Sequence, residues 1–140
     1  MQRLRLEPPE RTLSTHDIRV RVSDLNYGNH LGHDSLVSLL HEARVRLLAE
    51  HGMSELDLDG CRLMVADLAV QYRGEARLGQ VLRVEVGCGD VGSRGCELRY
   101  RVTDRDRGTE VALARTGVVF TDRESGRVVS LPARWARVCR

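Results

Sequence analysis

Residues 23–44 read SDLNYGNHLGHDSLVSLLHEAR, and the pattern changes halfway along this stretch. The segment NYGNHLG (26–32) is rich in Asn and Gly, which tolerate left-handed backbone and favour turns. From about Gly32 the apolar residues fall on one helical stripe, with polar residues on the other side. The stripe consists of Leu36, Leu39, Leu40, Ala43 and Leu47, and His51-Gly52 is a helix-ending signal. The sequence therefore predicts a polar turn that leads into one long helix.

Strand-like segments lie on both sides of this helix. HDIRVRVSD (16–24) places Ile18, Val20 and Val22 on one side, in the period of two typical of a half-buried strand. After a polar connector, four more such segments follow: CRLMVADLAVQYRG (61–74), LGQVLRVEVGCGDV (78–91), CELRYRVTD (96–104) and TEVALARTGVVFTD (109–122). Short turns between consecutive strands imply antiparallel pairing. We therefore expect an α+β fold, with one long helix packed on a five-stranded antiparallel sheet and a Pro-terminated tail.

The chain length fits one domain over residues 1–140, in which residues 1–14 form an irregular lead-in with Pro8-Pro9. A single open sheet leaves its edge strands bare. Pairing these edges across a two-fold axis covers them, so we expect at least a homodimer.

Composition narrows the possible partners. The chain is 41% apolar and 30% charged with a net charge of +2, which is globular and too balanced to indicate nucleic-acid binding. No apolar stretch approaches the ~20 residues of a membrane span, and the N-terminus lacks a signal-like apolar region. We expect a soluble, cytoplasmic protein. None of the four cysteines forms a CxxC pair, so we expect reduced thiols, with a Cys88–Cys96 contact across a hairpin as the open alternative.

Three motifs in this order resemble the hotdog fold, in particular the 4-hydroxybenzoyl-CoA thioesterase-like acyl-CoA thioesterases. RVSDLNYGNHLGHDSLVSLLHEAR (21–44) is similar to the family's Arg-x-x-Asp, Gly-His turn and helix ending in Glu-Ala-Arg. VQYRGEARLGQVLRVEV (70–86) and ARTGVVFTDRESGRVVSLP (114–132) are similar to its later strands and turns. The resemblance covers residues 16–135. It implies hydrolysis of an acyl-CoA or acyl-carrier-protein thioester by a dimer or tetramer, with no cofactor besides the CoA of the substrate.

Thioester hydrolysis needs a base or nucleophile, and donors aimed at the developing oxyanion. The resemblance implies that a carboxylate is the base or nucleophile. It also implies that backbone N–H groups at the helix start hold the oxyanion. The matching donor is the N–H of His33, with neighbours near Gly32, while Gly28 and Gly32 allow close approach of the backbone. The family's usual acidic position holds Asn26. An amide cannot take the proton, but it can orient a water or the thioester carbonyl.

The base is therefore expected among three other carboxylates. We rank Asp34 first, because it lies in the first turn of the helix, where the dipole favours negative charge. Asp24 is the first Asp of the motif, and Glu42 lies near the position where other hotdog thioesterases place an acid. Each has a structural alternative: Asp24 as a turn or cap residue, Asp34 as a favourable helix-start charge, and Glu42 as the partner of a nearby Arg.

Two further side chains belong to the expected site. His30 resembles the family's Gly-His histidine and is expected to bond the backbone or shape the pocket. Tyr27, like Tyr72, is expected in the core or the pocket wall. A metal site made of His30, His33 and His41 lacks an HExxH spacing, so no metal is expected.

Two other functions stay open at this point. Because Asn26 stands where the family has its acid, the chain could be a non-catalytic acyl-thioester-binding module. A hotdog dehydratase is disfavoured, since His30 does not match the position of the dehydratase histidine.

Overall fold

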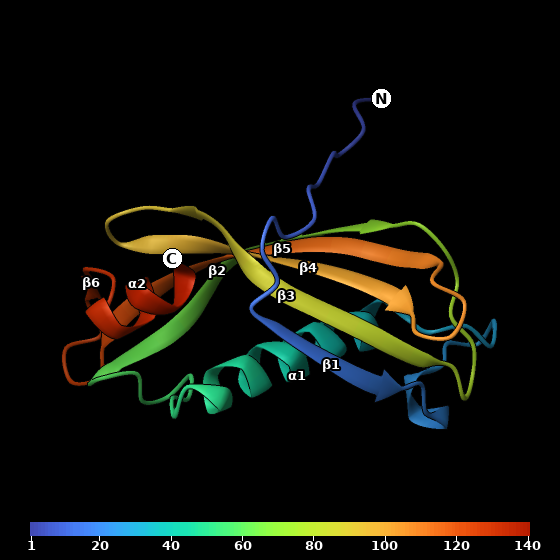
Figure 1. Cartoon of the computed structure of the whole chain (residues 1–140), viewed down its shortest axis with the longest axis horizontal. Coiled ribbons are helices and arrows are strands. Elements are labelled where there is room, and N and C mark those ends of the chain that lie inside the picture. The colour runs from blue at the N-terminus through green and yellow to red at the C-terminus, as the bar shows by residue number, and fades with distance from the viewer.

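The computed structural model describes all 140 residues (Figure 1). Its elements are β1 (Ser14–Arg19), the 3-10 helix η1 (Val22–Asp24), α1 (His33–Glu50), β2 (Cys61–Tyr72), β3 (Val81–Val91), β4 (Gly95–Asp104), β5 (Glu110–Asp122), β6 (Val128–Val129) and α2 (Ala133–Cys139). The predicted order, one strand, one long helix and four further strands, is confirmed. The two short elements at the C-terminus, β6 and α2, are additions to it.

All strand pairs are antiparallel, and the sheet order is β1-β3-β4-β5-β2. The two-residue β6 pairs with β5 and is the only addition to the five predicted strands. β1 and β2 are therefore the edges of the main sheet. In β2 a bulge between Val65 and Asp67 shifts the register, and Asp67 Oδ1 accepts the N–H of Gly117 across the ladder at 3.0 Å.

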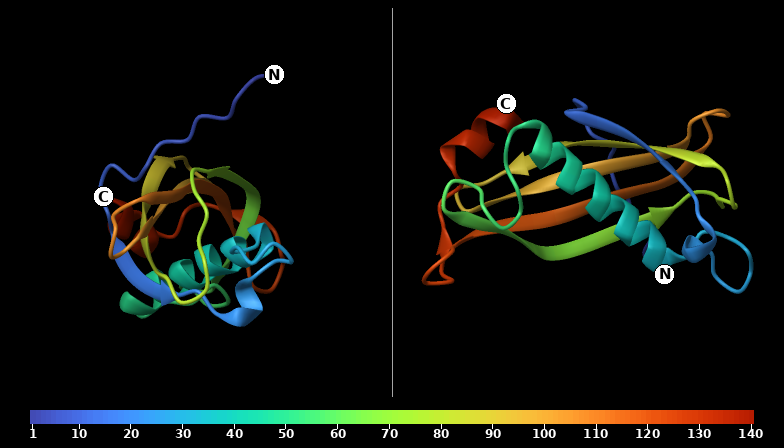
Figure 2. Two further views of the ribbon diagram at one scale, coloured as in Figure 1. Left: turned by 90° about the vertical axis from the view of Figure 1, so that its right-hand side faces the viewer. Right: turned by 90° about the horizontal axis from the view of Figure 1, so that it is seen from below.

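The long helix lies across one face of the curved sheet, as the view from below shows (Figure 2). Its five inward leucines are each at most 4% exposed: Leu36, Leu39, Leu40, Leu47 and Leu48. Burying five leucines contributes on the order of 10 kcal/mol before conformational entropy is subtracted. The predicted apolar stripe is thus the face that holds α1 on the sheet. The helix ends where predicted, with Gly52 in left-handed backbone at φ 69°.

The first strand is shorter than predicted. β1 ends at Arg19, and Val22 is 73% exposed, so the expectation that Val22 faces inward is wrong. The cause is local: the Asp24 carboxylate accepts the N–H of Arg21 at 2.8 Å, which turns the chain into η1. Lead-in residues 1–13 hold no helix or strand, although Leu6 is buried.

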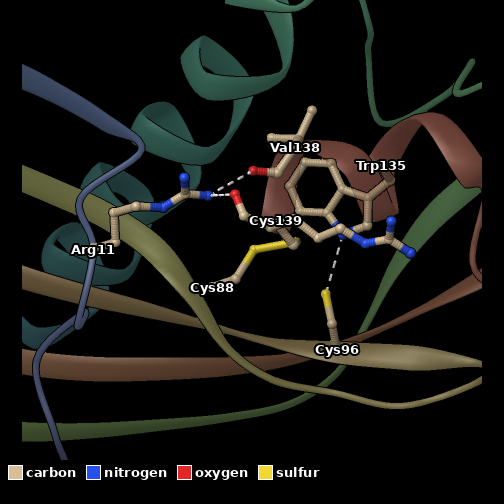
Figure 3. Close-up of a disulfide and its surroundings, with 7 residues drawn as sticks. Arg11, Cys88, Cys96, Trp135, Val138 and Cys139 are labelled. Carbon is tan, nitrogen blue, oxygen red and sulfur yellow. Dashed lines mark hydrogen bonds between the residues drawn. A yellow bond between two sulfur atoms is a disulfide. The ribbon is translucent and has the colours of Figure 1, made fainter.

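The tail after Pro132 forms a second helix that the sequence did not indicate. Trp135 on α2 is completely buried and packs against Phe120 of β5, with ring centroids 6.3 Å apart. Its indole N–H donates to the sulfur of Cys96 at 3.2 Å (Figure 3). Burial raises the pKa of the Cys96 thiol to about 11. One aromatic anchor therefore seats α2 against the end of the sheet.

The expectation of four reduced thiols is wrong, because Cys88 on β3 and Cys139 on α2 form a disulfide, with their Cα atoms 5.5 Å apart (Figure 3). Cys96 is not the partner, since an irregularity in the β3–β4 ladder places Val91 opposite Cys96 and Leu98 opposite Cys88. Cys61 and Cys96 remain free. Beside the disulfide, the Arg11 guanidinium donates to the carbonyls of Val138 and Arg140. The C-terminus is thus fixed to the sheet by covalent and polar contacts.

Candidate active site

The turn before α1 is organised by one amide side chain. Asn26 Oδ1 accepts the N–H groups of Gly28 at 2.9 Å and His30 at 3.2 Å, while the N–H of Asn26 donates to the carbonyl of His30 at 2.8 Å. Asn29 adopts a left-handed φ of 61°, which Asn tolerates better than most residues. The N–H groups of Gly28 and His30 are therefore used inside the loop. The amide oxygen of Asn26 builds this loop.

The first and second sequence motifs meet at this turn. The N–H of Leu31 donates to the carbonyl of Ala76 at 2.8 Å, and Ala76 is 1% exposed. His30 Nε2 lies 3.1 Å from Glu75 Oε2, so the ring partner is a carboxylate and not the expected backbone group. Because Glu75 is largely exposed, this pair contributes little stability. The contacts to residues 75 and 76 hold the turn in place beside the end of β2.

Three backbone donors are left free at the start of α1. Gly32 is the N-cap; its N–H donates to the carbonyl of Asp24 at 2.9 Å, and its carbonyl accepts the N–H of Leu36 at 2.9 Å. The N–H groups of His33, Asp34 and Ser35 have no acceptor in the protein. They lie at the positive end of an 18-residue helix. This arrangement can bind a developing anion, but the N–H of Gly32 is not available for it.

Of the three candidate bases, only Asp34 has a carboxylate with no ion pair or hydrogen bond to the protein. Asp24 is 5% exposed, and its carboxylate is bound to the backbone and guanidinium of Arg21. Glu42 pairs with Arg46 one turn further along the helix at 2.8 Å, which is the structural alternative expected for it. Neither carboxylate is free to accept a proton from water without giving up an arginine.

The Asp34 carboxylate lies over the backbone of the helix start. A Cβ placed on Gly32 would come within 2.5 Å of Asp34 Oδ1, so only Gly leaves room for this position. Burial, and then the negative charge of Asp34, raise the pKa of Tyr72 at the end of β2. The Asp34 carboxylate is therefore at the helix start and near enough to Tyr72 of the edge strand to act on it electrostatically.

The two tyrosines of the expected site are not core residues. Tyr27 is fully exposed in the single chain, and Tyr72 is 53% exposed. The expectation of Tyr27 in the core or in a pocket wall is therefore wrong for one chain by itself. Two histidines of the disfavoured metal site contact different carboxylates. His30 pairs with Glu75, and His41 pairs with Glu55.

Sequence reasoning missed a cavity of about 250 Å³ between α1 and β2. It is lined by Val37, Ser38, Leu40, His41, Arg44, Val65, Leu68 and Thr116. The only sequence signal is the polar stripe of Asp34, Ser38 and His41 along one side of the helix. Arg44 is the arginine of the Glu-Ala-Arg pattern, but that pattern does not indicate that its side chain lines a cavity.

The fold defines the class: an α+β protein of the hotdog type, in which backbone N–H groups without an acceptor lie at the start of α1 beside the carboxylate of Asp34. Residues 20–138 match the model of the Thioesterase-like superfamily, and the chain belongs to that family. A Synechocystis protein named as an esterase is 26% identical over 114 residues, 80% of this chain and 69% of that protein.

Solved structures with the same fold are similar over nearly the whole chain. The 1,4-dihydroxy-2-naphthoyl-CoA thioesterase Slr0204 of Synechocystis has a TM-score of 0.82 at 16% identity, covering 90% of this chain and 94% of its own. A hypothetical protein of Thermus thermophilus, TT1821, has a TM-score of 0.79 at 26% identity, covering 90% and 96%. The predicted hotdog fold and the thioesterase class are thus confirmed at the level of the family. No helix of the chain combines the length and apolar character of a membrane span.

Proposed function

We propose that the protein hydrolyses an acyl-CoA thioester to a free acid and CoA. The observation that carries this proposal is the unpaired Asp34 carboxylate beside the three unpaired N–H groups at the start of α1. CoA is proposed as the carrier because Slr0204 is named as a CoA thioesterase. An acyl-carrier protein is the second carrier to test.

In the proposed reaction Asp34 takes a proton from a water molecule as that water attacks the thioester carbon. The carbonyl oxygen becomes an oxyanion and accepts hydrogen bonds from the free N–H groups, with that of His33 first among them. The carbon–sulfur bond then breaks, and the proton held by Asp34 passes to the departing thiolate. Removing one such donor typically costs ~100- to 1000-fold in rate, so the helix start carries a large share of the catalysis.

Asn26 does not take part in proton transfer in this proposal. Its amide oxygen already accepts the N–H groups of Gly28 and His30, and these bonds shape the turn. An amide suits this role because it donates and accepts hydrogen bonds without titrating. In this proposal the base is Asp34 in the first helical turn of α1, and not the residue at position 26 in the loop before it. The non-catalytic reading, which depended on the missing acid, is not favoured, because Asp34 supplies one.

We also propose that the protein is at least a homodimer, joined at β2. This edge strand exposes apolar side chains, each 42–53% accessible: Met64, Val65, Leu68 and Tyr72. A second copy pairing along this edge would cover these side chains and the bare backbone groups. Since Asp34 acts electrostatically on Tyr72 at the same edge, the site would lie between the two subunits. Two such dimers could form a tetramer.

The test is thiol release by the purified protein from a panel of short, medium-chain and aromatic acyl-CoAs and one acyl-carrier protein. Release from at least one CoA thioester well above background is expected, with slower release from the carrier protein. Thermal stabilisation by acyl-CoA without any turnover would instead establish a binding module. Hydration of enoyl-CoA without thiol release would establish a dehydratase.

A further inference from the structure

The cavity between α1 and β2 begins next to the proposed catalytic group. Ser38 and His41 stand one and two turns after Asp34 on the same side of the helix, and Ser38 Oγ donates to the carbonyl of Asp34 at 3.4 Å. At a rise of 1.5 Å per residue, Ser38 lies about 6 Å and Arg44 about 15 Å beyond Asp34 along the helix axis. Val65 and Leu68 of β2 form the opposite wall. An acyl group attached to a thioester at the helix start could extend into this space.

The far end of the cavity holds a buried cation with a free donor group. Arg44 is only 7% exposed. Its Nε donates to Glu55 Oε2 at 2.9 Å and its Nη1 to the hydroxyl of Tyr100 at 3.2 Å, but Nη2 donates to no protein atom. Nη2 is not a fully buried atom, and Arg44 lines the cavity, so an oxygen of a bound ligand can take the place of water at this donor.

The charge at this end is already balanced inside the protein. Glu55 contacts Arg44 through one oxygen and His41 through the other. Burial by itself would raise the pKa of Glu55, but the hydrogen bonds from Arg44 and His41 keep it below its usual value. The carboxylate therefore stays ionised beside the guanidinium. A second carboxylate from a ligand would face Glu55 at close range, whereas a neutral oxygen would not be repelled.

We infer that the acyl group of the substrate carries a neutral oxygen, a hydroxyl or a ketone, at the end far from the thioester, and that Arg44 Nη2 donates a hydrogen bond to it. Val37, Val65 and Leu68 pack against the apolar middle of the acyl group. The volume of about 250 Å³ suits one ring or a short chain. This inference rests on the proposed hydrolysis and names its substrate class.

The test compares CoA thioesters that share a carbon skeleton: hexanoyl with 6-hydroxyhexanoyl, and phenylacetyl with 4-hydroxyphenylacetyl. A hydrogen bond from a charged donor favours the hydroxylated member by roughly ten- to hundredfold in kcat/KM. Adipoyl-CoA, which ends in a carboxylate, is expected to react more slowly than 6-hydroxyhexanoyl-CoA. Arg44→Lys keeps a charge for Glu55 but removes Nη2, so it should abolish the preference. Arg46→Lys, on the exposed side of the same helix, is the matched control and should keep it.

The outcomes separate the two proposals. Equal kcat/KM within both pairs of thioesters would overturn the inference and leave hydrolysis standing. A preference for adipoyl-CoA would overturn the assignment of a neutral oxygen. If no thioester is hydrolysed, the proposed function fails, and the inference fails with it. If Arg44→Lys does not fold, the ratio of kcat/KM within each pair of thioesters, measured on the wild-type protein, still tests the inference.

Discussion

The disulfide between Cys88 and Cys139 yields the sharpest prediction about stability. The two cysteines are 51 residues apart, and closing a loop of that length removes about 4 kcal/mol of conformational freedom from the unfolded chain in the chain-entropy model. A chain of 140 residues gains about 0.3 kcal/mol per kelvin of unfolding entropy. The double variant Cys88→Ala, Cys139→Ala should therefore unfold at a Tm roughly 10–15 °C below that of the wild type.

Thermal unfolding with and without a reducing agent measures this effect. Reductant should lower the Tm of the wild type to nearly that of the double variant, and should leave the double variant unchanged. Cys61→Ala is the matched control, because Cys61 is a free thiol. Thiol release at low temperature should persist in the double variant, since α2 lies at the opposite end of the sheet from the start of α1 (Figure 1). Equal Tm values under both conditions, or four free thiols in the denatured, unreduced chain, would refute the reasoning.

Three further predictions follow from single contacts. Gly32→Ala should displace the Asp34 carboxylate, because the new Cβ would lie 2.5 Å from Oδ1. We expect at least a tenfold loss of kcat/KM with little change in Tm. Full activity of this variant would contradict the prediction. Hydrogen bonds from the backbone of Arg107, and then from Gln80, hold the pKa of Asp104 below its usual value, so its contribution is complete above about pH 4 and is lost as pH falls through the lowered pKa. The Tm difference between wild type and Asp104→Asn should thus shrink from pH 6 to pH 2, and a constant difference would refute this. Met64→Arg should place a charge in the proposed β2 interface and shift sedimentation toward the monomer, while an unchanged dimer would exclude that edge.

Local periodicity was enough to predict the main architecture. The leucine stripe of α1 has one dominant period and is buried as predicted. The strands between residues 61 and 122 alternate or are joined by short turns, so their antiparallel pairing follows. The segment 133–139 has no such period. Its helix depends on the burial of Trp135, a tertiary contact that local sequence does not encode.

The disulfide was missed for a related reason. Spacing suggested a contact between Cys88 and Cys96, but the register irregularity moves these residues out of alignment. Cys139 reaches Cys88 only because α2 folds back onto the sheet. A bond between residues so distant in sequence leaves no local pattern.

The candidate site was only partly predictable. The family pattern located the turn, and helix electrostatics ranked Asp34 first among the carboxylates. The sequence raised a pair of Glu42 with a nearby arginine only as an alternative, and it could not show the pair of Asp24 with Arg21, because that pair depends on the turn. It also could not show that Arg44 is buried with a free Nη2, since a charged residue beside a leucine stripe usually lies at the surface.

The most direct test of the central claim is the rate of CoA thiol release by Asp34→Asn on the best acyl-CoA substrate, beside Glu42→Gln as the matched control. The substitution keeps the size of the side chain and removes the base, so kcat/KM should fall by ~100- to 10,000-fold while the Tm is preserved and the control retains its activity. Wild-type kcat/KM in Asp34→Asn, together with loss of activity in Asp24→Asn or Glu42→Gln, would contradict the account and move the base to another carboxylate.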